Sequence, residues 1–175
     1  DTLFLPPDSL RPRIAPTEKD EQGNWLRGVV HDPTSRRMGG VAGHAGLFST
    51  AADLARYCRM ILNGGEIDGV RVFKTETLKL MTTVSTPASM TDQRALGWDV
   101  DTRYSKPRGG FAVGTSFGHT GVTGTCLWID LQSQSFFVFL SSHLHGTDPK
   151  SDVRKLYEQL GGIVSAELLG SAEKP

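Results

Sequence analysis

The chain has 175 residues, of which 38% are hydrophobic and 22% charged, a composition typical of one compact globular domain. Its 19 Lys and Arg residues balance 19 Asp and Glu residues, and this zero net charge argues against a nucleic-acid partner. No apolar run approaches the roughly 20 residues of a membrane-spanning helix. Cys58 and Cys126 lie in apolar stretches, so we expect buried free thiols.

The first part of the chain carries few signals of regular structure. Residues 1–30 are rich in proline and polar side chains, which predicts an extended arm rather than a core element. Residues 31–95 are expected to form a mainly helical part. Within that part, residues 39–48 are mostly small, and such a run permits close backbone approach and positive φ angles.

A helix is predicted after Thr50, which can cap the first turn together with Asp53. Asn63-Gly64-Gly65 supplies the stop. One apolar face recurs at helical spacing, formed by Leu54, Tyr57, Cys58, Ile61 and Leu62. A second helix is expected from Thr75, and residues 83–94 are expected to be loop.

Residues 96–142 are predicted to supply a sheet, apart from a loop over residues 101–118. The expected strands are Leu96–Val100, Thr125–Leu131 and Phe136–Leu140. The short connection between the last two makes them an antiparallel hairpin, and their nearly continuous apolar pattern indicates that both faces are covered. A C-terminal helix follows over residues 150–170, interrupted at Gly161-Gly162. This order of elements is typical of the α+β class rather than of βαβ units.

The run Gly114-Thr115-Ser116-Phe117-Gly118 fits the G-x-S-x-G nucleophile elbow, with Asp130 and then His143 or His145 in the order of an α/β-hydrolase triad. An elbow needs a strand before the serine and a helix directly after it. Here a strand pattern follows, and no βαβ alternation is present. The sequence therefore favours a Gly- and Ser-containing loop that leads into a strand.

Two further patterns are weak. None of the five histidines forms the i, i+4 pair of a helical zinc site, so we expect no metal and no cofactor. Ser171-Ala172-Glu173-Lys174 formally matches the S-x-x-K nucleophile signature. It lies within the last five residues, past the expected final helix, where a frayed tail cannot hold a catalytic pair.

His119 stands between Gly118 and Gly121 in a glycine-rich segment, Gly118-His119-Thr120-Gly121-Val122-Thr123-Gly124. A histidine at a glycine-flanked strand start can present its imidazole to a cleft and act as a charge or proton partner. The alternative, a loop histidine without function, is equally open from these residues alone.

Several segments together resemble the class C β-lactamase-like, penicillin-recognising serine hydrolases. These segments are Val30-His31-Asp32, the run from Gly39 to Tyr57, and His119-Thr120-Gly121, which resembles the H-T-G form of the family's K-T-G strand. Residues 124–130 are similar to the hairpin that follows. The resemblance is collinear from about residue 1 to residue 170. It implies part of a β-lactamase/transpeptidase-like fold, an antiparallel sheet with flanking helices.

The resemblance also implies a site. His119 would take the place of the K-T-G lysine beside the nucleophile, Thr120 would line the cleft, and Gly121 would let the backbone approach the substrate. The backbone N–H of Val122 would be the second oxyanion donor, worth about 3–4 kcal/mol to a tetrahedral intermediate. His44 would lie near the cleft without an assigned role.

The family places S-x-x-K and a Y-x-N element upstream of these segments, and this chain has no credible copy of either. The resemblance therefore implies a serine-dependent acyl hydrolase whose N-terminal half is missing, inactive without that half. Its substrate would be an ester, an amide or peptide, or a β-lactam, including peptidoglycan-like molecules. We expect its bare sheet edge to form a homo-oligomer or to pair with the missing half. A non-catalytic module that binds a ligand or a partner is the alternative, and localisation stays open.

Overall fold

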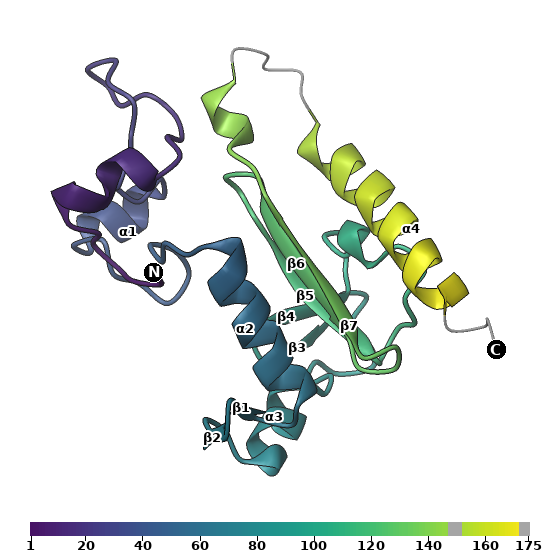
Figure 1. Cartoon of the computed structure of the whole chain (residues 1–175). Coiled ribbons are helices and arrows are strands. Elements are labelled where there is room, and N and C mark those ends of the chain that lie inside the picture. The colour runs from purple at the N-terminus through teal and green to yellow at the C-terminus, as the bar shows by residue number, and fades with distance from the viewer. Residues whose placement is uncertain (147–151, 172–175) are drawn as a thin grey trace.

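The computed structural model describes residues 1–146 and 152–171, which form a small lobe and a larger body (Figure 1). The lobe comprises residues 1–48. It contains the 3₁₀ helix η1 (Asp8–Arg13) and the helix α1 (Pro33–Arg37), and an antiparallel bridge joins Leu3 to Phe48. Residues 1–30 therefore cross the lobe as turns and one 3₁₀ helix.

The helix α2 (Ala51–Leu62) begins where the sequence predicts. The Oγ1 atom of Thr50 accepts a hydrogen bond from the Asp53 N–H (3.1 Å), which satisfies one of the free amides of the first turn. At the other end Gly65 has a φ of 99°, and a Cβ there would lie 2.2 Å from the Phe73 carbonyl oxygen. A small hairpin and a second helix follow, β1 (Glu66–Ile67), β2 (Val70–Arg71) and α3 (Thr75–Thr82).

The body is built on a five-stranded antiparallel sheet in the order β3-β4-β5-β6-β7. Its strands are β3 (Gln93–Ala95), β4 (Trp98–Asp101), β5 (Ser116–Gly121), β6 (Thr125–Asp130) and β7 (Ser135–Leu140). The predicted loops over 83–94 and 101–118 are wrong at Gln93–Arg94, at Asp101 and at Ser116–Gly118. All of these residues except Phe117 are polar or glycine, so they carry no strand pattern of their own. They become strands because neighbouring strands pair with them.

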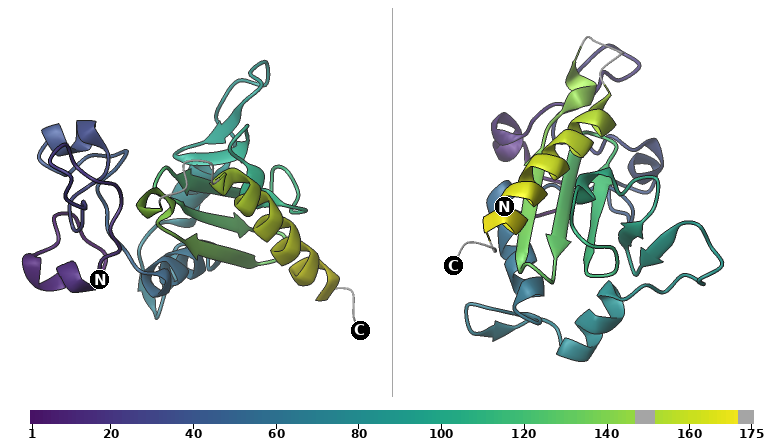
Figure 2. Two further views of the ribbon diagram at one scale, coloured as in Figure 1. Left: turned by 90° about the horizontal axis from the view of Figure 1, so that it is seen from above. Right: turned by 90° about the vertical axis from the view of Figure 1, so that its right-hand side faces the viewer.

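The two faces of the sheet are covered by different helices (Figure 2). Side chains alternate between the faces along each strand. On one face, buried Phe117 and Ile129 belong to a core cluster with Cys58 of α2. On the other, Tyr157 packs edge-on against Phe139, with ring centroids 6.3 Å apart. The expectation of two covered faces is confirmed, and so is the α+β class.

The C-terminal helix α4 (Val153–Ser171) runs without a break through Gly161-Gly162. The predicted interruption is wrong because Gly161 faces the 3₁₀ helix η2 (Lys106–Arg108), and a Cβ there would lie 2.4 Å from the Pro107 carbonyl oxygen. Ser171 is the last helical residue rather than part of a tail. The rest of that S-x-x-K match, like residues 150 and 151 of the predicted helix, lies outside the described residues. Within the described ranges, no helix combines the length and the apolar character needed to cross a lipid bilayer.

Candidate functional site

The predicted H-T-G residues occupy the last half of β5. Within the described residues β4 pairs with β5 at one position, Asp99 with Gly118. The segment from His119 to Gly121 therefore extends beyond the pairing with β4. On its other edge the same segment pairs with β6. Because Phe117 and His119 are two residues apart, both side chains point to the face of the sheet that α2 covers. The His119 side chain is exposed.

The imidazole of His119 is oriented by the backbone of the next residue, Thr120. Its Nδ1 atom lies 2.8 Å from the carbonyl oxygen of Thr120. A carbonyl oxygen only accepts, so Nδ1 carries the proton of this hydrogen bond. In the neutral ring the exposed Nε2 atom then holds a lone pair, and it can accept a proton from a neighbouring group.

Val122 follows directly, in the turn between β5 and β6. Its side chain is 75% exposed, and its backbone N–H has no hydrogen-bond acceptor in residues 1–146 and 152–171. The preceding carbonyl, that of Gly121, accepts a hydrogen bond from the Gly124 N–H (3.0 Å). The segment from His119 to Val122, predicted from the sequence as the site, thus carries an oriented imidazole and an unused backbone N–H at the end of β5.

Ser116 cannot serve as the nucleophile of an elbow in this fold. Its side chain is fully buried, and its Oγ donates a hydrogen bond to the Ala112 carbonyl oxygen (2.8 Å). It begins the strand β5 and pairs with Asp130, so no helix follows it. The sequence-based rejection of the nucleophile elbow is confirmed.

The two cysteines are also unsuited to nucleophilic chemistry. Cys58 and Cys126 are buried and free, as expected. Burial raises the pKa of each thiol to about 12, so the reactive thiolate is scarce at neutral pH.

His44, which the resemblance left without a role, has a partner in the lobe. Its Nε2 atom lies 3.0 Å from Oδ1 of Asp32, and the same carboxylate caps α1 by accepting the Ser35 N–H (2.6 Å). The Ser35 amide and then His44 hold the pKa of Asp32 below its usual value. The contact joins Val30-His31-Asp32 to the run from Gly39 to Tyr57, two of the segments that carry the resemblance. It holds the glycine-rich segment against the start of α1.

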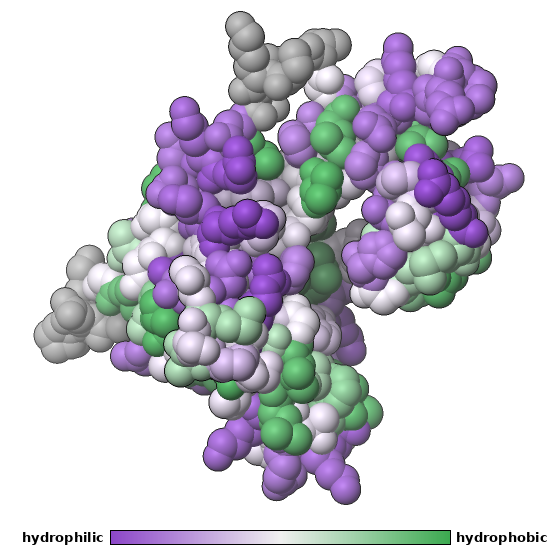
Figure 3. Space-filling model, turned by 180° about the vertical axis from the view of Figure 1, so that it is seen from behind, coloured by the Kyte–Doolittle hydropathy of each residue, from purple (hydrophilic) through white to green (hydrophobic). Residues whose placement is uncertain are grey.

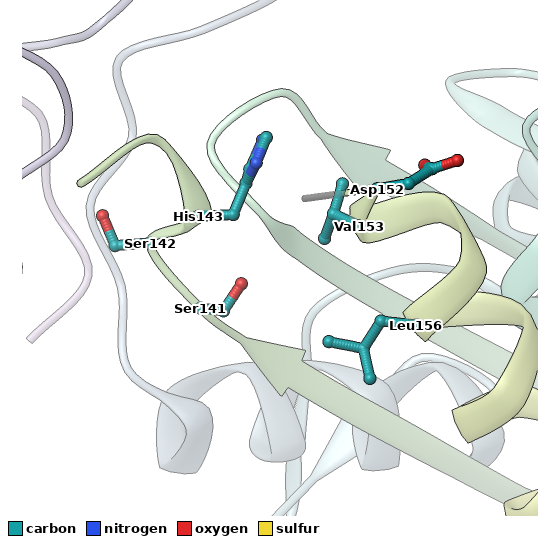
Figure 4. Close-up of a pocket in the computed structure, with 6 residues that line it drawn as sticks. All are labelled: Ser141, Ser142, His143, Asp152, Val153 and Leu156. Carbon is teal, nitrogen blue, oxygen red and sulfur yellow. The ribbon is translucent and has the colours of Figure 1, made fainter. Parts of the chain in front are cut away.

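A cavity of about 360 Å³ lies between the end of β7 and the start of α4. Figure 4 shows the side chains that line it, from Ser141, Ser142, His143, Asp152, Val153 and Leu156. The 3₁₀ helix η3 (His143–His145) contributes His143, whose Nε2 atom also contacts the Val122 carbonyl oxygen (2.9 Å). Sequence reasoning missed this cavity because its walls come from two separate stretches of the chain, residues 141–143 and residues 152–156.

Seen from behind, the surface is hollowed between the lobe of residues 1–48 and the sheet (Figure 3). Two contacts join the lobe to η3. The Ser142 hydroxyl donates to the Pro16 carbonyl oxygen, and the rings of Trp25 and His145 meet edge-on at 4.1 Å between centroids. The hollow therefore has the lobe on one side and the sheet on the other.

Comparison with known proteins identifies the family. The family model described as Beta-lactamase matches residues 1–161. A "Putative D-alanyl-D-alanine carboxypeptidase" of Escherichia coli (strain K12) is 36% identical over 160 residues, covering 82% of this chain and 35% of the relative. A protein of Salmonella typhi with the same description is 36% identical over 151 residues, covering 77% of this chain and 34% of that protein. The chain thus spans about a third of the length of these relatives.

Solved structures agree on the fold. A penicillin-binding protein homologue from Caulobacter crescentus superposes with a TM-score of 0.59 at 17% identity, over 94% of this chain and 48% of that one. A beta-lactamase from Mycobacterium bovis superposes with a TM-score of 0.54 at 22% identity, over 71% of this chain and 46% of that one. Because the family model covers most of these 175 residues, the chain belongs to the beta-lactamase family.

Proposed function

We propose that this chain contributes the H-T-G strand and one oxyanion donor to a serine-dependent acyl hydrolase. The observation that carries the proposal is the pairing, on one strand end, of the oriented His119 imidazole with the unused N–H of Val122. Thr120 and Gly121 lie between them and line the same edge. A backbone N–H fixed before the reaction stabilises the negative oxygen of a tetrahedral intermediate because it needs no reorganisation.

The nucleophile of this proposed enzyme would come from an S-x-x-K segment outside these 175 residues. The serine oxygen attacks the substrate carbonyl carbon and loses its proton to a neighbouring base, and the carbonyl oxygen becomes the oxyanion. Collapse expels the leaving group, which takes up a proton, and leaves an acyl-enzyme. Water then attacks this ester and regenerates the serine. His119 would lie beside the serine and exchange or stabilise the moving proton.

The relatives suggest the substrate. The Escherichia coli and Salmonella typhi relatives at 36% identity carry the description "Putative D-alanyl-D-alanine carboxypeptidase", which supports a peptide or peptidoglycan-like substrate. Structural neighbours include a family VIII carboxylesterase and a 6-aminohexanoate-dimer hydrolase from Bacillus anthracis, so esters and other amides are the next substrates to test. A peptide that ends in D-alanyl-D-alanine is our first choice.

Complementation tests the proposal. The 175 residues are co-expressed with the N-terminal two thirds of the Escherichia coli relative, and hydrolysis of nitrocefin, p-nitrophenyl acetate and a D-alanyl-D-alanine peptide is measured. We expect His119→Ala to lower kcat/KM by about 10²-fold or more, the usual size of a general acid–base contribution. His119→Lys should retain more activity than His119→Ala, because lysine restores a cationic donor.

The matched control is His145→Ala, which removes an imidazole from η3, the 3₁₀ helix that follows β7. It should leave kcat/KM within about twofold, since the ring contact of His145 is with Trp25 of the lobe rather than with the β5–β6 turn. Unchanged kcat/KM in His119→Ala would rule out the role of that residue. A complemented protein with no hydrolysis of any of the three substrates would count against the proposed function as a whole.

A further inference from the structure

The turn between β5 and β6 is held by an unusual set of hydrogen bonds. Five consecutive carbonyl oxygens, from Gly121 to Thr125, each accept at least one. The Val122 oxygen faces Nε2 of His143 (2.9 Å), and the Thr123 oxygen accepts the His143 backbone N–H (3.2 Å). A turn of this kind ordinarily leaves several carbonyls to water, so five bound oxygens mark it as tightly fixed.

The remaining carbonyls are bound by Ser141 and Tyr157. The Gly124 oxygen accepts both the N–H (3.1 Å) and the hydroxyl (2.6 Å) of Ser141. The Tyr157 hydroxyl lies 3.1 Å from the Thr125 oxygen and 3.5 Å from the Gly121 oxygen. Tyr157 is only 2% exposed, and burial raises its pKa, so this hydroxyl keeps its proton over the working pH range.

Gly124 allows these partners to come so close. Its φ is 109°, and a Cβ there would lie 2.5 Å from the Ser141 hydroxyl and 3.0 Å from the His143 nitrogen. The donors come from the end of β7, from η3 and from α4, so the last part of the chain holds the turn in place. His143 must donate through Nε2, because a carbonyl only accepts.

This arrangement fixes the direction of the Val122 N–H. A trans peptide is planar, with its C=O and N–H pointing in opposite directions. Because the Gly121 carbonyl is held toward Gly124 and Tyr157, the Val122 N–H has to point away from them, where the described residues offer it no acceptor. A donor that is fixed and unoccupied before reaction is what oxyanion stabilisation requires.

We propose that His143 and Tyr157 are positioning residues, which hold the β5–β6 turn so that the Val122 N–H faces the reacting carbonyl. Neither residue touches substrate. The inference rests on the proposed function, in which Val122 supplies an oxyanion donor. It adds two residues from distant segments to the machinery of that site.

The first test uses the 175-residue chain and needs no activity. The ¹⁵N relaxation of the Val122 amide should give an order parameter of about 0.85, as in a rigid strand. In the double variant His143→Leu/Tyr157→Phe it should fall below about 0.6. Tyr57→Phe is the matched control, because that hydroxyl has no hydrogen-bond partner among the described residues. A rigid Val122 in the double variant, with the fold intact by circular dichroism, would overturn the inference.

The second test uses the complemented protein. Tyr157→Phe and His143→Leu should each lower kcat by about tenfold to a hundredfold, with KM within about threefold, because an oxyanion contact acts in the transition state. Affinity for phenylboronic acid, which mimics the tetrahedral adduct, should fall in parallel. His143→Gln should recover activity, since its amide retains a donor at similar reach.

These measurements separate the inference from the proposed function. If Val122 becomes mobile but kcat is unchanged, the positioning role is wrong. If His119→Ala impairs hydrolysis while the variants of His143 and Tyr157 do not, the proposed function stands and only this inference fails. Lost stability with unchanged kcat and unchanged boronate affinity would likewise show that the two residues serve the fold alone.

Discussion

Gly161 of α4 lies against Gly109, which follows η2, at a distance that admits no side chain. A Cβ on Gly109 would stand 2.1 Å from the Gly161 carbonyl oxygen. Beside this contact the Ser165 hydroxyl accepts a hydrogen bond from the Gly110 N–H (2.7 Å). Gly161 weakens helix propensity but allows α4 to dock on the body. A Cβ on the neighbouring Gly162 would meet no atom within 4 Å.

Gly161→Ala and Gly162→Ala should have opposite effects on stability. A methyl group at 161 overlaps the η2 backbone, and overpacking of this kind costs about 1–3 kcal/mol. At the open position 162, alanine should gain about 1 kcal/mol of helix propensity and raise Tm by about 2–4 °C. Thermal melting followed by circular dichroism measures both. Equal shifts in the two variants would contradict the close contact.

The chain alone should not turn over nitrocefin or p-nitrophenyl acetate. Loss of the nucleophile costs a serine hydrolase on the order of 10⁶ in turnover, and Ser116 is buried and hydrogen-bonded. Steady-state assays of the wild type and of Ser116→Ala should give the same background rate. Turnover by the wild type that disappears in Ser116→Ala would restore the nucleophile elbow as an explanation.

The Asp32–His44 contact should make stability depend on acid pH. The pKa of Asp32 is lowered in the folded chain, so its carboxylate stabilises the fold above the unfolded-state pKa near 3.8. That contribution is lost as pH falls through the folded-state value. The Tm difference between wild type and Asp32→Asn should therefore be fully present at neutral pH and shrink below about pH 4. Ser9→Ala, at an exposed side chain of η1 that carries no ionisable group, is the control and should show no such trend.

The outer edge of β7 should promote association. Among the residues that the structure describes, β7 is the last strand of the sheet and pairs with β6 alone. Its Phe136, Phe137, Val138 and Phe139 are all half-buried. Exposed apolar edge strands recruit other strands. Light scattering on the purified chain should show a dimer or larger species, which Leu140→Lys should weaken.

Val70→Lys is the matched control, because Val70 is exposed on the separate β1–β2 hairpin and should not affect assembly. A stable monomer that melts cooperatively and binds no hydrophobic dye would contradict the prediction. Conversion of the self-associated species to a 1:1 complex on adding the N-terminal two thirds of the Escherichia coli relative would favour pairing over self-association.

The sequence alone determined the features that depend on neighbouring residues. Thr50 and Asp53 predicted the start of α2, since a cap involves residues three apart. The apolar runs predicted β6 and β7 and their hairpin, and the H-T-G segment pointed to His119 at a strand. The family was also evident in the collinear segments, and the comparisons confirm it.

Tertiary structure decided whatever depends on residues far apart. Gly161-Gly162 was expected to interrupt a helix, but its contact with η2 maintains α4, because the lost propensity is offset by docking. Ser116–Gly118 became strand through pairing with Trp128–Asp130. His143 and Tyr157 have no local pattern that links them to Val122. Hydrogen bonds between residues separated by 21 and 36 positions leave no periodic signal, so only the folded chain brings them together.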